Sequence, residues 1–97
     1  MKILALEHEL PGVTTEQFQR YANDEARKVW DLHQAGIARE LYFRADKNEA
    51  VLILECTSVI EAHEILATLP LVQAGSISFE VIPLKAYPGF ARLFEKS

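Results

Sequence analysis

The spacing of apolar residues, which changes several times along the chain, constrains the fold more than any other feature. The first apolar run stops at the turn dipeptide Pro11-Gly12 and predicts a strand at about residues 2–9. Thr14 with Gln17 has the spacing of a capping arrangement at the start of a helix. Apolar side chains then recur at steps of three and four from Phe18 to Leu32, which is typical of one face of a helix. Gly36 supplies a stop, so we expect a helix of about 20 residues before it.

The middle of the chain repeats this change of spacing. Two apolar runs, at residues 37–45 and 50–56, flank a polar turn and predict a hairpin. Ser58 and Glu61 have the spacing of a capping box, which predicts a second, shorter helix that ends at Pro70.

A last strand is expected at residues 76–86, and it completes the order β-α-β-β-α-β. That order is the ferredoxin-like α+β arrangement, with a four-stranded antiparallel sheet and both helices on one face. Pro83 cannot donate to a ladder, so its end of the strand belongs at a sheet edge or a bulge. The 97 residues are too few for two domains, and we expect residues 1–97 to form one.

The predicted third strand is apolar on both faces. Val51 and Ile53 point one way, whereas Leu52 and Leu54 point the other. In a lone domain of this kind one sheet face meets water, so something must cover the second face. We expect a homodimer through this face, with the apolar tail, residues 86–97, forming a short helix and a dimer arm. The alternative is a monomer whose tail folds back over its own sheet.

Composition excludes several classes of partner and site. The 14 acidic and 10 basic residues give a net charge of −4, so nucleic acid and anionic membranes are poor partners. A single cysteine excludes an internal disulfide framework and a thiolate zinc cage. The apolar stretches are far shorter than a membrane span, and no leader is evident, so we expect a cytoplasmic protein.

Glu25 is the first candidate for chemistry, because it lies within the apolar stripe of the first helix. A carboxylate there is expected to be partly buried, and burial raises a carboxyl pKa toward neutrality. Such a group can serve as a general acid or base at pH 7. The alternative is a structural pairing with a basic side chain such as Arg39.

The histidines and the second strand supply the other polar candidates. His63 lies at the margin of the second helix's apolar stripe, where a structural role is commoner than a catalytic one. The three histidines lack the spacing of a metal site, so we expect no metal. Alternation puts Arg39 and Tyr42 on opposite faces of their strand. Either could hold a carboxylate or phenolate, and the alternative is cross-strand pairing on a solvated edge.

Two blocks of the sequence resemble the muconolactone isomerase family. The segment 58–71 begins with Ser-Val, carries His63 and closes on Leu-Pro-Leu, like the second helix of those enzymes. An Asp-Glu pair of the family falls on Asp24-Glu25. The resemblance covers roughly residues 20–85. The family's Gly-x-x-Arg-x-Leu-aromatic strand is matched by Gly36, Arg39, Leu41 and Tyr42.

The resemblance implies a dimeric α+β barrel and a proton shift in a small unsaturated lactone or ring carboxylate, without metal or cofactor. On this basis Glu25 would move the proton and His63 would orient or support it. Arg39 would hold a carboxylate, with Tyr42 beside it in the substrate site. Glu40 departs from the pattern, because it stands where a histidine is familiar. A non-catalytic dimer that binds a small ligand, a cofactor-free monooxygenase and a purely structural dimer stay open as alternatives.

Overall fold

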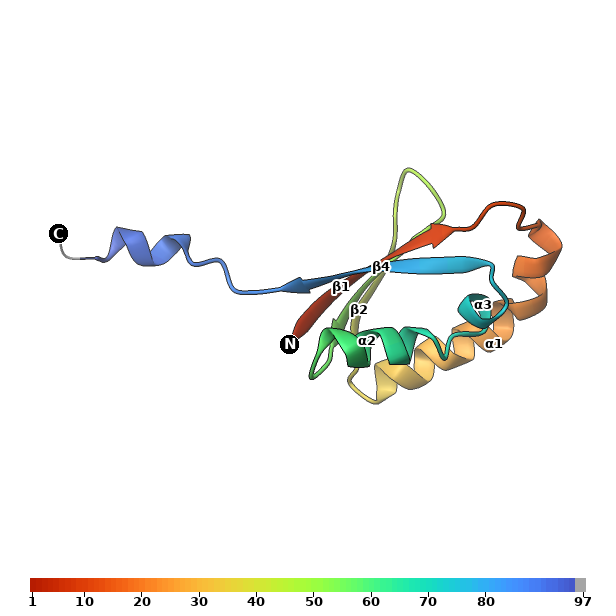
Figure 1. Cartoon of the computed structure of the whole chain (residues 1–97), viewed down its shortest axis with the longest axis horizontal. Helices are drawn as coiled ribbons and strands as arrows, with labels where there is room; N and C mark the ends of the chain where they lie inside the picture. Colours follow the sequence, from red (N-terminus) through yellow and green to blue (C-terminus); the bar gives the residue numbers. More distant parts are fainter. Residues whose placement is uncertain (96–97) are drawn as a thin grey trace.

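The order of elements predicted from the sequence is the order found in the computed structural model, which describes residues 1–95. Figure 1 shows the path of the chain. The elements are β1 (Lys2–Glu9), α1 (Thr15–Gln34), β2 (Ala38–Phe43), β3 (Ala50–Glu55), α2 (Val59–Leu66), α3 (Pro70–Gln73), β4 (Ile77–Leu84) and the 3-10 helix η1 (Gly89–Leu93).

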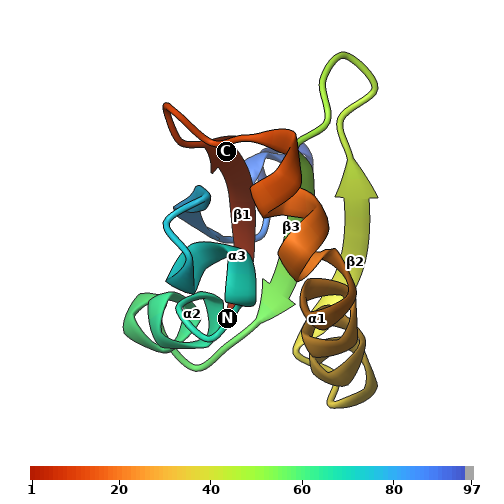
Figure 2. The ribbon, with the colours of Figure 1, turned by 90° about the vertical axis from the view of Figure 1, so that its right-hand side faces the viewer.

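The four strands form one antiparallel sheet in the order β2-β3-β1-β4. The helices α1, α2 and α3 lie on one side of this sheet (Figures 1 and 2). This is the predicted ferredoxin-like α+β arrangement. Pro83 lies in β4, an edge strand, as its missing N–H requires. No helix within residues 1–95 is long and apolar enough to cross a membrane.

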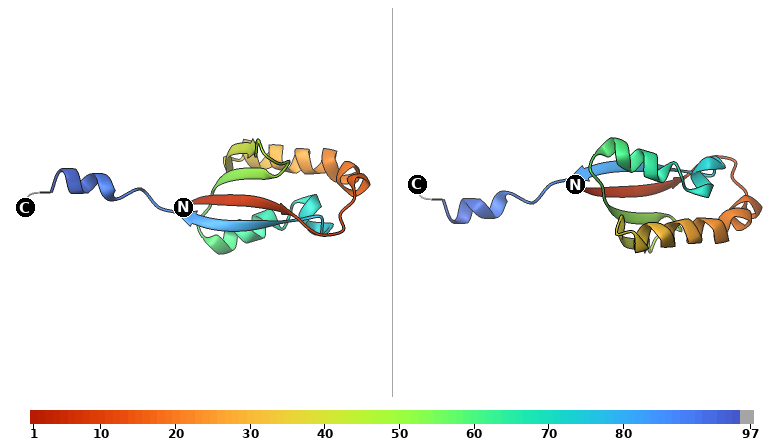
Figure 3. Two further views of the ribbon diagram at one scale, coloured as in Figure 1. Left: turned by 90° about the horizontal axis from the view of Figure 1, so that it is seen from above. Right: turned by 90° about the horizontal axis from the view of Figure 1, so that it is seen from below.

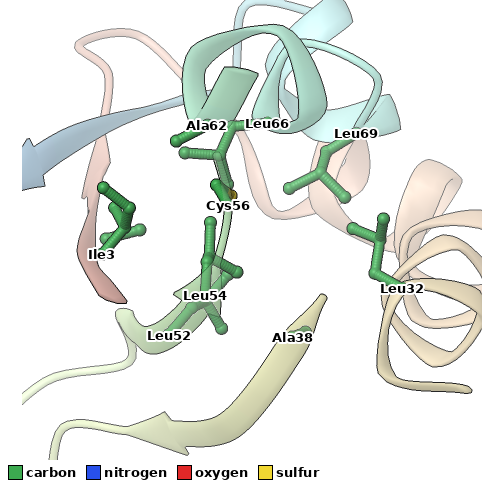
Figure 4. Close-up of a cluster of buried hydrophobic side chains, with 10 residues drawn as sticks. Ile3, Leu32, Ala38, Leu52, Leu54, Cys56, Ala62, Leu66 and Leu69 are labelled. Atoms are coloured by element: carbon green, nitrogen blue, oxygen red, sulfur yellow. The ribbon is translucent and has the colours of Figure 1, made fainter. Parts of the chain in front are cut away.

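The hydrophobic core fills the space between the sheet and the helices (Figure 4). Strand alternation directs every second side chain of β1 and β3 toward the helices. The central members, all with no more than 5% of their surface exposed, are Ile3, Ala5, Leu52, Leu54, Ala62 and Leu66. Burial of these side chains is the main force that holds the helices on the sheet.

Both long helices start where their capping residues predict. The hydroxyl of Thr14 accepts the N–H of Gln17 at 3.2 Å, and the Gln17 side chain accepts the N–H of Thr14 at 3.1 Å. Ser58 accepts the N–H of Glu61 at 3.0 Å in front of α2. These contacts satisfy N–H groups that the first helical turn leaves without partners.

The second helix is shorter than the sequence predicts, because it is interrupted. α2 ends at Leu66, and Pro70 begins a separate short helix, α3, instead of ending the first one. Proline suits the first turn of a helix, where its missing N–H costs nothing and its fixed φ is already helical. Pro70 is therefore compatible both with the end of one helix and with the start of the next.

A register shift between Ala38 and Glu40 overturns the predicted alternation of β2. Ala38 pairs with Leu54, and Leu41 pairs with Leu52, so an extra residue lies between two positions on the helix face. Arg39 therefore does not share a face with Leu41. Its Nε instead donates to the carbonyl of Gly36.

The described part of the tail, residues 86–95, extends away from the sheet, as Figures 1 and 3 show. The predicted short helix is present as η1. The aromatic side chains in and beside it are largely exposed: Tyr87 by 71%, Phe90 by 67% and Phe94 by 82%. The alternative in which the tail folds back over its own sheet is therefore wrong for this conformation.

Candidate functional site

A cavity of about 500 Å³ lies between the helix face of the sheet and α1. This volume is within the range of small-molecule sites. Most of its lining is apolar. The lining residues come from all four strands, from α1 and α3, from the turn between β2 and β3, and from the link between α2 and α3. The apolar side chains include Phe18, Val29, Leu41, Leu52, Leu69 and Phe79.

Glu25 lines this cavity from α1. It follows Phe18 and Ala22 at steps of four and three residues, so all three side chains share one face of the helix. Its Oε1 accepts the N–H of Leu71 at 2.9 Å. Burial raises the pKa of Glu25, and the bond from Leu71 opposes that shift. The structural alternative of a Glu25–Arg39 pair is not formed, since each side chain has another partner.

Glu7, which is not among the residues predicted from the sequence, is a second carboxyl in the cavity. It lies on β1 with only 8% of its surface exposed. Burial is the main cause that raises its pKa to about 7, and the negative charge of Glu25 adds to the shift. At neutral pH Glu7 can thus hold or release a proton. The sequence signal that could have identified Glu7 is the strand alternation of β1, which places Glu7 on the same face as Ile3 and Ala5.

Tyr42 borders the cavity on β2, but its hydroxyl is engaged elsewhere. The hydroxyl donates to Oε1 of Glu40 at 2.8 Å, and this bond raises the pKa of Tyr42. Tyr42 pairs with Val51 in the sheet, so its side chain belongs to the face away from the helices. The phenol is therefore turned from the carboxyls.

Arg39 and His63 do not line the cavity. Arg39 is exposed at the start of β2, and His63 is exposed on α2. The structure therefore brings Glu25 together with Glu7, places Tyr42 at the border, and leaves the other two candidates outside. Their roles stay predictions from the resemblance. Within residues 1–95 no cluster of three or more His, Cys, Asp or Glu side chains has a metal-binding arrangement.

The raised pKa of Glu7 predicts a pH-dependent stability. The unfolded chain loses this proton near the ordinary value of 4.5, whereas the folded chain keeps it up to about pH 7. Stability therefore falls as the pH rises through this interval. We expect Glu7→Gln to be more stable than the parent by about 1 to 3 kcal/mol at pH 8, and nearly equal to it at pH 4.5.

Urea unfolding at both pH values measures this difference. Glu64→Gln is the matched control, because Glu64 is an exposed residue of α2 that does not line the cavity. A Glu7→Gln protein less stable than the parent at pH 8 would mean that favourable contacts, and not burial, dominate around this carboxylate.

Comparisons with known proteins agree with this architecture. A crystal structure of muconolactone isomerase has a TM-score of 0.75, with 23% identity, over 91% of this chain and 92% of that chain. A 5-chloro-2-hydroxyhydroquinone dehydrochlorinase from Burkholderia phenoliruptrix AC1100, in complex with 2,5-dihydroxybenzoquinone, has a TM-score of 0.64 and 19% identity over 92% and 98%. At these identities the likeness shows a shared fold.

Family membership comes from the sequence itself. No curated protein sequence matches the chain significantly. The family model described as muconolactone delta-isomerase matches residues 5–89, which include the cavity lining and nearly the whole sheet. The chain belongs to the muconolactone delta-isomerase family.

Proposed function

We propose that this protein is an isomerase that moves a proton within a small unsaturated ring compound bound in the cavity. The observation that carries the proposal is the presence of two carboxyls, Glu7 and Glu25, in a largely apolar cavity. Burial raises the pKa of both, that of Glu7 to about 7, and a raised pKa favours proton exchange between a carboxyl and a bound ring. Membership of the isomerase family supports the same reaction class.

In this reaction Glu25 takes a proton from a ring carbon, and the electron pair of that C–H bond forms a new double bond. The old double bond opens at its far end, where a carbon receives a proton from the carboxyl. No atom is gained or lost, and Glu25 returns to its starting state. The N–H of Leu71 holds one oxygen of Glu25 at 2.9 Å, which fixes the carboxylate for this transfer.

The structural neighbours support a ring compound as the substrate. The dehydrochlorinase of similar fold has 2,5-dihydroxybenzoquinone bound in its crystal structure, so the fold accommodates an oxygenated six-membered ring. A fold does not determine a reaction. A monooxygenase would consume oxygen with an oxidisable phenol, and a binding protein would retain its ligand without exchanging protons.

Proton exchange in D₂O tests the proposal directly. We would incubate the protein with muconolactone and with its uncharged primary amide, and follow deuterium incorporation and double-bond migration by NMR. Protein-dependent exchange in at least one compound is the expected result. Exchange no faster than in buffer for both compounds, at millimolar concentration, contradicts the isomerase function.

We also infer that the protein is a homodimer through the sheet face opposite the helices. The register places Leu4 opposite Ile53 and Leu6 opposite Val51 on this face, and all four are half-buried in the single chain. The exposed aromatic tail described above adds apolar surface next to the domain. A second copy of the same sheet would cover the face.

Removal of the tail is expected to weaken the dimer. A chain truncated after residue 86 loses the three exposed aromatic rings of the tail, each of which buries up to about 150–250 Å² in an interface. We expect at least a tenfold higher dissociation constant for the truncated chain. Light scattering measures the mass, which for the full chain should be twice 11.0 kDa. An unchanged dissociation constant would show that the tail is no arm, and a full chain of single mass would contradict the dimer.

A further inference from the structure

Glu7 and Glu25 reach the cavity from opposite walls. Glu7 lies on β1 in the sheet, and Glu25 lies on α1, which is on the helix side of the sheet (Figure 2). Glu7 is only 8% exposed, whereas Tyr42 and Phe43, on the open side of the cavity, are 57% and 66% exposed. A ring that enters from the open side therefore meets Glu7 at the inner wall, with Glu25 across from it.

The contacts of the two carboxyls favour different protonation states. Oε1 of Glu25 accepts the N–H of Leu71 at 2.9 Å, and such a bond stabilises the ionised form. Glu7 is the more deeply buried of the two, and burial raises its pKa to about 7 although the N–H of Ala50 opposes the shift. Two carboxyls in one cavity do not both ionise readily, so Glu7 keeps the proton while Glu25 is free to act as a base.

The charged groups around Glu7 are all acidic. They are Glu9 on β1, Glu25 on α1 and Glu49 just before β3. On β4 the partner of Glu7 is Phe79, which carries no charge. Within residues 1–95 no ion pair joins a basic side chain to Glu7. A buried carboxyl in such surroundings takes up a proton, because no cation neutralises its charged form.

Negative charge moves through the ring during the proposed reaction. In an unsaturated lactone the ring carbonyl is conjugated with the double bond. When Glu25 removes a proton from the ring, part of the charge passes to the carbonyl oxygen before the far carbon receives a proton. A hydrogen-bond donor at this oxygen stabilises the charge as it develops. A protonated carboxyl can be that donor, whereas a carboxylate can only accept.

We propose that Glu7 is a second catalytic residue, which in its protonated form donates a hydrogen bond to the ring carbonyl oxygen while Glu25 moves the proton between carbons. This inference rests on the proposed function, because it adds a residue to the same reaction. The proton of Glu7 stays on Glu7 throughout, and no bond to carbon forms there. Glu25 is thus the base of the site, and Glu7 stabilises the charge that the base creates.

The pH dependence of proton exchange tests this role. We would follow muconolactone in D₂O by NMR with the full chain between pH 5 and pH 9, and subtract the rate in buffer. The parent rate is expected to fall about tenfold per pH unit above about pH 7, because Glu7 loses its proton there. A parent rate that is constant or rises between pH 7 and pH 9 overturns the proposal.

Two substitutions of Glu7 distinguish a hydrogen-bond donor from a base. Glu7→Gln keeps a donor that does not titrate, so its rate at pH 6 should lie within about tenfold of the parent rate and should not fall above pH 7. Glu7→Leu removes the donor and should lose at least about 10²-fold. Glu64→Gln, an exposed position of α2 outside the lining, should keep the parent profile. A Glu7→Gln protein without activity, or a Glu7→Leu protein with the parent rate, overturns the proposal once thermal melting has shown that the variant is folded.

A ligand that cannot react separates this inference from the proposed function. The saturated analogue of muconolactone has no double bond to move, and a ¹³C label in its ring carbonyl reports a hydrogen bond to the oxygen. At pH 6 the bound resonance should lie downfield of its position in Glu7→Leu, and Glu64→Gln should match the parent. If this shift is present but muconolactone exchanges no protons, the Glu7 contact stands and the isomerase function is wrong. If muconolactone exchanges protons but the shift is absent, the function stands and the role of Glu7 is wrong.

Discussion

Glu25→Gln will slow protein-catalysed proton exchange in the bound ring by about 10²- to 10⁴-fold, the usual contribution of a positioned acid or base. Glutamine has the shape of glutamate, and its amide oxygen can still accept the N–H of Leu71. The variant should therefore fold normally while lacking the group that takes and returns the proton. NMR-detected exchange in D₂O measures the rate.

Asp31→Asn serves as the control on the same helix, because Asp31 is exposed and does not line the cavity. Its exchange rate should equal that of the parent. A fully active Glu25→Gln protein would remove Glu25 from the proton transfer. An inactive variant that still binds the amide normally would place its role in chemistry and not in binding.

Leu54→Ala will destabilise the fold by about 2 to 5 kcal/mol, because it leaves a void in a closely packed core. Leu54 is completely buried in β3, opposite Ile3 of β1 and Ala38 of β2. A loss of this size is a large part of the total stability of a small domain. Urea unfolding measures it.

The matched control for the core is Ile60→Ala on α2, where 71% of the isoleucine is exposed. We expect this change to alter the unfolding free energy by no more than about 0.5 kcal/mol. A Leu54→Ala loss as small as that of the control would mean that the space between sheet and helices is not tightly packed around β3.

The elements of the fold were predictable where their signals are local. The Thr14 and Ser58 caps and the long apolar stripe of α1 act within a few residues, and each appears where the sequence places it. Pro70 was ambiguous, because a proline favours a helix start and a helix stop for the same steric reason. The extra residue near Arg39 depends on how β2 pairs with β3, which no local pattern specifies.

The candidate site was predictable in part for a similar reason. The helical spacing identifies Glu25, because its apolar neighbours lie on the same face of the same helix and are visible in the local sequence. Burial of Glu7 depends on which face of β1 the helices cover, and that choice is made only when distant parts of the chain pack together. The position of Arg39 relative to the cavity depends on the same pairing of β2 that the sequence leaves open.

Pro83 in the edge strand β4 also bears on how copies of this chain can aggregate. An exposed strand edge is a template on which another chain can extend the sheet, and repeated addition leads to fibrils. Pro83 has no N–H to offer an incoming strand, so the donor row at this end of β4 is interrupted. The sheet thus resists growth at this edge, while its apolar face stays available for a contact that closes after two copies.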